Sequence, residues 1–196
     1  MSWAIWITGL PGSGKTTLAR GVAAALRARG IPVKLLGLDE IRRVLTPVPT
    51  YTGVEREIVY RALVHMAKLL TEADVPVIID ATGHRRVWRE LASRLIPLFA
   101  EVQLRCPLPT CIEREATRRA GSPPRGIYSR AGQPGSTVPG VDLAYEESLS
   151  PQLVLDTNTV DLWTQVQQVL HLVRRLSRQA ARRDYRPVSV DKSPIP

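Results

Sequence analysis

Residues 9–16 have the types and the spacing that a phosphate-binding loop needs. They read Gly-Leu-Pro-Gly-Ser-Gly-Lys-Thr and match the pattern G-x-x-x-x-G-K-[ST] in full. Glycines at these positions let several backbone N–H groups point inward at one phosphate. We therefore predict a nucleoside triphosphate site, in which Lys15 neutralises the β- and γ-phosphates and the Thr16 hydroxyl binds Mg²⁺. The expected ATP contacts are Gly9, Leu10, Pro11, Gly12, Ser13, Gly14, Lys15, Thr16 and Thr17.

The remaining motifs favour transfer of a phosphoryl group to a bound acceptor over its hydrolysis. A GTPase would carry an Asn-Lys-x-Asp motif, which the sequence lacks. Motors and helicases usually place a glutamate after the aspartate that ends an apolar strand, but Asp80 is followed by Ala81. A purely structural turn would explain the glycines of residues 9–16 but not the Gly-Lys-Thr that ends them.

Asp39 and Arg42 follow the second apolar segment of the chain. In a parallel sheet the loops after the strands converge on the ligand crevice, so Asp39 is expected to face the phosphate loop. A carboxylate there can accept a proton from an acceptor hydroxyl and help to order magnesium. The alternative is that Asp39 caps a short helix through residues 41–43, and the two roles are compatible. We predict Lys15 and Asp39 as the catalytic residues.

The elements that must position these residues alternate between strand and helix. Hydrophobic periodicity and glycine breaks predict five strands and five helices. The strands are expected at residues 3–8, 32–36, 75–79, 101–105 and 152–155, and the helices at 15–29, 54–73, 86–94, 108–119 and 162–183. This alternation predicts an α/β fold of the P-loop NTPase type, with a five-stranded parallel sheet flanked by helices. The long proline-rich stretch between the expected helix at 108–119 and the expected strand at 152–155 predicts a lid over about residues 119–150.

Several stretches of the sequence resemble the adenylyl-sulfate kinases, P-loop enzymes that phosphorylate the ribose 3′-hydroxyl of adenylyl sulfate. The resemblance covers residues 3–157 and rests on residues 7–19, 35–42, 125–131, 139–146 and 153–157. It implies an ATP-dependent, Mg²⁺-dependent kinase with adenylyl sulfate as its small-molecule partner. The acceptor contacts that it implies are Asp39, Arg42, Tyr51, Arg56, Arg86, Arg125, Arg130 and Val138.

The sequence departs from the family pattern at three positions. The family motif Leu-Leu-Asp-Gly-Asp-x-x-Arg has its first aspartate where this chain has Gly37. An expected asparagine is Val59, and one of the two aromatic residues that stack on adenine is Val138. The stretch Ile-Asp-Ala-Thr at residues 79–82 is more similar to the small P-loop kinases related to polynucleotide kinase. Two alternatives to an adenylyl-sulfate kinase therefore remain: a kinase that acts on another hydroxyl acceptor, such as a nucleic-acid 5′ end or a small metabolite, and a nucleotide-dependent binding protein.

Weaker signals come from single arginines and one histidine. Arg114 and Arg118 end the helix before the lid, where they would contact ATP; a solvated helix end explains them equally well. Arg125 and Arg130 lie inside a family-like stretch and are the better lid residues. His84 is lone in its loop and is expected at the surface.

Composition and charge set limits on the class of protein. The chain has 196 residues, of which 44% are hydrophobic and 23% charged, as in an ordinary globular protein. We expect one kinase domain over residues 1–185 and a flexible tail over 186–196. No segment is apolar enough for a membrane, and two isolated cysteines favour the cytoplasm. The net charge of +9 is concentrated in the last helix, whose arginines are best explained as a solvated face. Nucleic acid is therefore not an expected partner, whereas a homodimer is compatible with the sequence.

Overall fold

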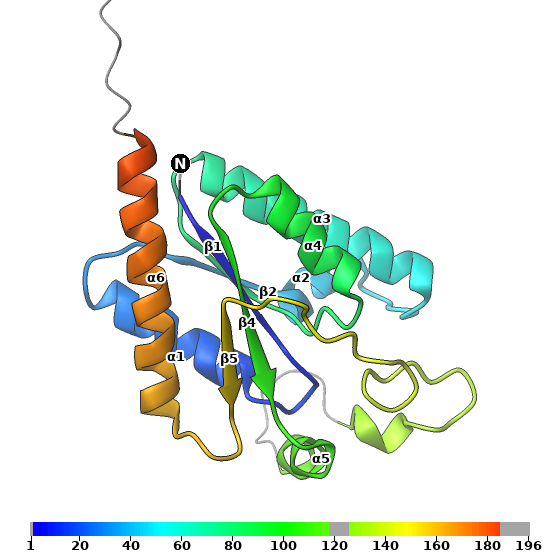
Figure 1. Cartoon of the computed structure of the whole chain (residues 1–196). Coiled ribbons are helices and arrows are strands. Elements are labelled where there is room, and N and C mark those ends of the chain that lie inside the picture. The colour runs from blue at the N-terminus through cyan, green and yellow to red at the C-terminus, as the bar shows by residue number, and fades with distance from the viewer. Residues whose placement is uncertain (1, 118–125, 185–196) are drawn as a thin grey trace, which may run out of the picture.

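Five parallel strands form a sheet in the order β2-β3-β1-β4-β5 (Figure 1). The computed structural model describes residues 2–117 and 126–184. The strands are β1 (Ala4–Thr8), β2 (Lys34–Gly37), β3 (Val77–Asp80), β4 (Phe99–Arg105) and β5 (Leu153–Asp156). All five residues of the central strand β1 are buried, as expected for a strand that is covered on both faces. The predicted parallel sheet is confirmed.

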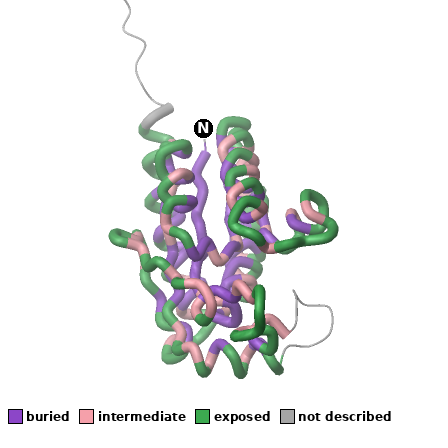
Figure 2. The backbone as a smooth tube through the Cα atoms, turned by 90° about the vertical axis from the view of Figure 1, so that its right-hand side faces the viewer, coloured by how far each residue is buried: buried purple, intermediate pink, exposed green. Residues whose placement is uncertain are grey.

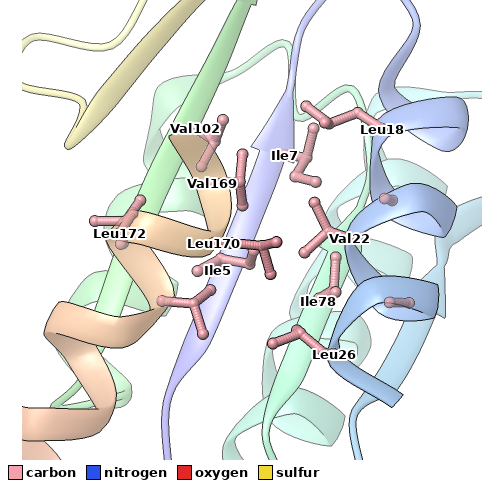
Figure 3. Close-up of a cluster of buried hydrophobic side chains, with 14 of the residues drawn as sticks. Ile5, Ile7, Leu18, Val22, Leu26, Ile78, Val102, Val169, Leu170 and Leu172 are labelled. Carbon is pink, nitrogen blue, oxygen red and sulfur yellow. The ribbon is translucent and has the colours of Figure 1, made fainter. Parts of the chain in front are cut away.

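Helices α1 (Lys15–Arg27) and α6 (Leu162–Asp184) cover one face of the sheet. Because side chains alternate along a strand, Ile5 and Ile7 of β1 both point to this face. Figure 3 shows them between Leu18 and Val22 of α1 on one side and Val169 and other residues of α6 on the other. This cluster fixes the start of α1, and with it the end of the phosphate loop.

Helices α2 (Leu38–Leu45), α3 (Gly53–Glu72) and α4 (Arg86–Leu95) lie over the opposite face. Trp6 of β1 points to this side and stacks with Tyr60, which in turn stacks on Trp88 with ring centroids 3.9 Å apart. In Figure 2 the buried residues accordingly run through the middle of the molecule, between two layers of exposed helix surface.

Helix α5 (Leu108–Ala116) and the short 3₁₀ helix η1 (Tyr128–Arg130) lie beyond the carboxyl ends of the strands (Figure 1). From Ala131 to Gln152 the chain forms no helix or strand. Part of the predicted lid, including Arg118 and Arg125, lies outside the described residues, as does the predicted tail. No helix in the described part of the chain is both long enough and apolar enough to cross a membrane.

The ends of the predicted strands and helices lie within three residues of the observed ends. Helix α2 is the exception, because the sequence did not predict its full length. The sequence indicated at most a short helix over residues 41–43 with Asp39 as its cap. Instead α2 begins at Leu38, its N-cap is Gly37, and no side chain caps it. The capping role of Asp39 was therefore wrong, because Asp39 is the second residue inside the helix.

Candidate active site

The turn from β1 into α1 has the backbone shape that a phosphate loop requires. Gly12 and Gly14 have φ angles of 82° and 96°, which favour glycine. A Cβ on Gly12 would lie 2.2 Å from the carbonyl oxygen of Cys111 on α5, so no larger residue fits there. The first turn of α1 contains no acidic residue, so the helix N-terminus keeps its full attraction for a phosphate.

Two side chains of this loop are placed to meet an anion. Lys15 is only 9% exposed, and its Nζ donates to the carbonyl oxygen of Leu10 at 2.8 Å. The Ser13 hydroxyl is buried without a hydrogen-bond partner among the described residues. Because an unsatisfied buried hydroxyl is costly, a bound phosphate oxygen would stabilise this arrangement.

Asp80, at the end of β3, belongs to this site although it was not among the predicted site residues. Burial raises the pKa of its carboxyl group, while the charge of Lys15 and a hydrogen bond from the Thr16 side chain lower it. Hydroxyl and carboxylate oxygens are ligands that Mg²⁺ prefers. The signal for it in the sequence is an apolar run that ends in an aspartate.

A second pocket opens on the far side of the phosphate loop, at the start of α6. Gly14 and Thr17 line it together with Arg114 and the turn after β5. Arg114 donates to the carbonyl oxygen of Thr157 at 3.0 Å, and the Thr157 hydroxyl donates to the carbonyl oxygen of Ser13 at 3.0 Å. Arg114 thus lines a pocket that borders the phosphate loop.

The largest group of predicted acceptor residues meets in one pocket beside the phosphate loop. Its walls come from α2, the start of α3, and the chain after η1. Pro11 of the phosphate loop also lines it, so a ligand in this pocket would lie next to the bound phosphates. The predicted residues that line it are Asp39, Arg42, Tyr51, Arg56, Arg130 and Val138.

Arg42 has the features of an anion-binding residue. It is 6% exposed, and its Nη1 donates to Glu55 Oε1 at 2.6 Å. Burial raises the pKa of the Glu55 carboxyl, but hydrogen bonds from Thr50 and Arg42 outweigh this effect and hold the pKa below its usual value. The Nη2 atom of Arg42 is buried and has no partner among the described residues. An anionic group of the acceptor would satisfy it.

Tyr51 is held in an unusual backbone conformation. Its φ angle is 54°, in the left-handed region that a bulky residue rarely adopts. The guanidinium carbons of Arg42 and Arg56 lie 5.1 and 5.7 Å from the centre of its ring. Both distances are in the range of cation–π contacts, which fix the ring at the wall of the pocket.

Arg56 and Asp142 together hold the loop that carries Val138. Arg56 Nη2 donates to the carbonyl oxygen of Thr137 at 2.8 Å, and its Nε donates to the carbonyl oxygen of Tyr51 at 3.0 Å. The Asp142 carboxylate accepts from the backbone N–H groups of Gly132 and Val138 at 2.8 and 2.7 Å. Arg56 therefore positions this loop against α3, in addition to lining the pocket. Asp142 lies in the family-like stretch 139–146 but was not among the predicted site residues.

One predicted acceptor residue, Arg86, is not brought to the pocket. Arg86 begins α4, where its Nε pairs with Glu90 at 3.1 Å and its Nη1 donates to the carbonyl oxygen of Glu147 at 3.4 Å. Arg125 lies outside the described residues. Val138 is 7% exposed and packs with Cys111 and Tyr128, so it offers the pocket a small aliphatic surface and no ring.

Comparison with known proteins agrees with this geometry. The family model described as adenylylsulphate kinase matches residues 1–156. A probable adenylyl-sulfate kinase from Archaeoglobus fulgidus is 38% identical over 162 residues, which are 82% of this chain and 99% of that protein. The adenylyl-sulfate kinase of a Synechococcus strain is 37% identical over 78% of this chain and 83% of its own length.

A solved structure gives the same result for the fold. The Mycobacterium tuberculosis APS kinase CysC, in complex with AMPPNP and APS, superposes with a TM-score of 0.76 at 28% identity. The match covers 88% of this chain and 98% of that one. It confirms the P-loop fold expected from the sequence. With the family model over most of its length and these relatives beside it, the chain belongs to the adenylylsulphate kinase family.

Proposed function

We propose that this protein transfers the γ-phosphoryl group of ATP to the 3′-hydroxyl of adenylyl sulfate, giving 3′-phosphoadenylyl sulfate and ADP. One observation carries the proposal: the pocket that contains Arg42 and Tyr51 is also lined by Asp39 and by Pro11 of the phosphate loop. Donor and acceptor would therefore meet in one space. Membership of the family supplies the chemical identity of the acceptor.

The donor side uses the phosphate loop and the pocket beyond it. Backbone N–H groups of residues 12–15 would hold the β-phosphate, and Lys15 would neutralise the charge on the transferring group. The nucleoside would extend towards Arg114 and Thr157. The complex of the M. tuberculosis relative with AMPPNP supports ATP as the donor.

Thr16 and Asp80 are the residues that would hold Mg²⁺. Their side chains are in hydrogen-bond contact, and both offer the oxygen ligands that this ion prefers. The bound ion supplies neutralisation of charge on the β- and γ-phosphates. Lys15, whose charge also acts on Asp80, completes this group of residues.

Asp39 would receive the proton of the acceptor. Its side chain is exposed in the first turn of α2 and lines the acceptor pocket. As the 3′-oxygen forms its bond to the γ-phosphorus, the bond from that phosphorus to the bridging oxygen of ADP breaks, and the hydroxyl proton passes to the Asp39 carboxylate. The negative charge left on ADP is neutralised by Lys15.

The acceptor would be held by its base and by its anionic groups. Tyr51 would stack on the adenine, and the unpartnered Nη2 of Arg42 would bind the phosphosulfate. Arg130 lines the same pocket, and we propose that it closes over the phosphates together with Arg125. Closure would exclude water, which would otherwise compete as acceptor.

The test is acceptor-dependent release of ADP by the purified chain with MgATP. We compare adenylyl sulfate with AMP, a 5′-hydroxyl oligonucleotide and gluconate, and locate the new phosphate by ³¹P NMR. ADP release that requires adenylyl sulfate, with the phosphate on the 3′-oxygen, supports the proposal. Turnover of only another hydroxyl compound would assign a different kinase reaction, and binding of ATP without turnover would indicate a nucleotide-dependent binding protein.

We also propose a cytoplasmic location, one domain over residues 1–185 and a homodimeric assembly. Cys106 and Cys111 are both free thiols, which agrees with a reducing compartment. Light scattering on the purified chain would test the assembly.

A further inference from the structure

The positive charge of this protein is concentrated in the sequence segments that build one layer of the fold. Residues 1–38 and 162–183 contain ten of the 27 basic residues and none of the 18 acidic ones. The rest of the chain, with 17 basic and 18 acidic residues, is nearly neutral. These two segments include α1 and all of α6 except its last residue, Asp184, and the two helices lie together on one face of the sheet (Figure 1).

Four arginines on α6 form what we call the arginine stripe: Arg174, Arg175, Arg178 and Arg182. At about 100° per residue they all fall within a sector of about 100° on one side of the helix, over a length of about 12 Å. All four are exposed, while the neighbouring Leu172, Val173 and Leu176 are buried in the cluster that packs against the sheet. The sequence pattern thus produces one continuous cationic surface on the outside of the molecule.

The arginine stripe has no partner within the described part of the chain. None of the ion pairs or side-chain hydrogen bonds formed there involves its four residues, whereas Arg61, Lys68 and Arg105 elsewhere each pair with a glutamate. Exposed pairs of that kind stabilise a fold only slightly, so their absence on α6 costs the fold little. The four charges remain available to an external anion.

The stripe also lies away from the active site. Ser177, in its middle, accepts a hydrogen bond from Trp3 Nε1 at 3.0 Å, which places this part of α6 beside the chain just before β1. The phosphate loop follows the carboxyl end of β1, at the other end of the strands (Figure 1). The acceptor pocket lies beside this loop, because Pro11 lines it. The family model ends at residue 156, before α6 begins. The kinase site therefore gives no account of this surface.

The chemistry of the stripe selects among anionic partners. Protein interfaces use arginine too, but together with aromatic side chains around an apolar core. The exposed large hydrophobic residues of α6 are Leu162 and Trp163, at its opposite end, and none lies between Thr164 and Arg182. Binding to phosphates needs only closely spaced cations, and the guanidinium group matches phosphate geometry better than an ammonium does. We propose that the arginine stripe binds the phosphate backbone of double-stranded nucleic acid.

The proposal is tested by fluorescence anisotropy with a labelled 20-base-pair DNA duplex and the full chain. If all four arginines neutralise phosphates, the slope of log K against log salt is about −3 to −4, so that affinity falls about 100-fold between 50 and 200 mM salt. The quadruple variant Arg174→Gln, Arg175→Gln, Arg178→Gln and Arg182→Gln should abolish this slope. The double variant Arg174→Gln and Arg178→Gln should remove about half of it, and serves if the quadruple variant does not fold.

A matched control separates the stripe from net charge alone. Arg61→Gln, Lys68→Gln, Arg94→Gln and Arg105→Gln together remove the same charge from exposed or partly exposed positions outside α1 and α6. We expect this variant to keep the salt slope and to lose less than about threefold in affinity. Equal loss in both quadruple variants would overturn the proposal, as would absence of duplex binding by the wild type at 50 mM salt. Binding to polyglutamate or to phosphatidylserine vesicles but not to the duplex would also overturn it. Release of ADP with adenylyl sulfate should be unchanged in both variants, which checks folding.

Discussion

Gly37 and Asp80 are register partners on the adjacent parallel strands β2 and β3. The motif that residues 35–42 resemble has an aspartate at the position of Gly37, and this chain does not. Asp80 supplies a carboxylate from the neighbouring strand, at the same edge of the sheet and beside Lys15 and Thr16. We infer that Asp80 of β3 supplies the acidic group that the family motif places on β2, at the position of Gly37.

Replacing Asp80 by asparagine should therefore act through magnesium. Asp80→Asn keeps the size of the side chain and removes its charge. Changes to groups that bind or orient a metal typically weaken its binding by 10–100-fold, so we expect the Mg²⁺ concentration for half-maximal turnover to rise by about tenfold or more. Calorimetry of ADP binding with and without Mg²⁺ provides a second measurement. An unchanged Mg²⁺ dependence in both would remove Asp80 from the site.

The same relationship predicts a rescue. No atom lies within 4 Å of the place where a Cβ on Gly37 would stand, and the φ of −88° at this residue suits any amino acid. Adding Gly37→Asp to the Asp80→Asn variant should restore part of the lost Mg²⁺ affinity. Gly37→Ala in the same background is the control, because it adds a side chain without a charge and should restore nothing.

Loss of the phosphate-loop lysine should nearly abolish turnover without unfolding the protein. Lys15 donates a hydrogen bond to a backbone carbonyl of its own loop, and in our proposal its charge stabilises the phosphates of the ligand. We expect Lys15→Ala to lower kcat/KM by at least about 10³-fold, since charge stabilisation of this kind is a large part of phosphoryl transfer. The measurement is ADP release, with circular dichroism as the check on folding. Wild-type turnover in a folded variant would mean that this loop is not the active phosphate site.

Asp39→Asn separates catalysis from stability. Gly37 is the N-cap of α2, so asparagine at position 39 removes no capping hydrogen bond, and thermal stability should change little. Turnover should fall by about 10²-fold or more, as expected when a general base is lost. Glu40→Gln, at the next exposed position of the same helix turn, should leave turnover unchanged. A large loss of stability with normal turnover would contradict the catalytic role.

The sequence predicted those parts of the site that local pattern determines. The phosphate loop is specified within eight consecutive residues, and the strand–helix alternation places it at the carboxyl end of the central strand β1. Asp39 and Arg42 were located because they directly follow a strand. What could not be predicted depends on tertiary contacts. Asp142 lies in the family-like stretch 139–146, but its hydrogen bonds to the Val138 loop form only in the folded chain, and Arg86 pairs with Glu90 outside the pocket.

His84 shows the same limitation, and it leads to a pH dependence. A lone loop histidine was expected at the surface, but His84 is 4% exposed and lies edge-on to Trp88. Burial lowers the pKa of its imidazole to about 4, helped by the charges of Arg56 and Arg85 and opposed by that of Glu146. Because the unfolded chain takes up this proton near pH 6.5, the contribution of His84 to stability is complete above that pH. It is lost as pH falls from about 6.5 towards 4.

Urea unfolding between pH 7.5 and 5 measures this effect. Protonation of the unfolded chain predicts that the free energy of unfolding falls by about 2 kcal/mol between pH 7.5 and 5, with a slope of at most about 1.4 kcal/mol per pH unit. Nδ1 of His84 has no hydrogen-bond partner among the described residues, so His84→Phe removes no bond to it and should flatten the curve. His65→Gln, at an exposed position on α3, is the control and should not. Identical curves for wild type and His84→Phe would refute the assignment.

The affinity for adenylyl sulfate depends, in our proposal, on a single stacking ring. Tyr51 lines one wall of the acceptor pocket, and Val138 lies where the family has a second aromatic residue. Base–aromatic stacking contributes about 1–3 kcal/mol, which corresponds to about tenfold or more in affinity. Val138→Phe should therefore tighten binding of adenylyl sulfate by about tenfold, and Tyr51→Ala should weaken it with little effect on ATP. Val138→Leu enlarges the side chain without adding a ring, so it should give no gain. Calorimetry in the presence of ADP measures all three variants. Equal tightening by leucine and phenylalanine would show that filled volume, and not stacking, limits affinity in this pocket.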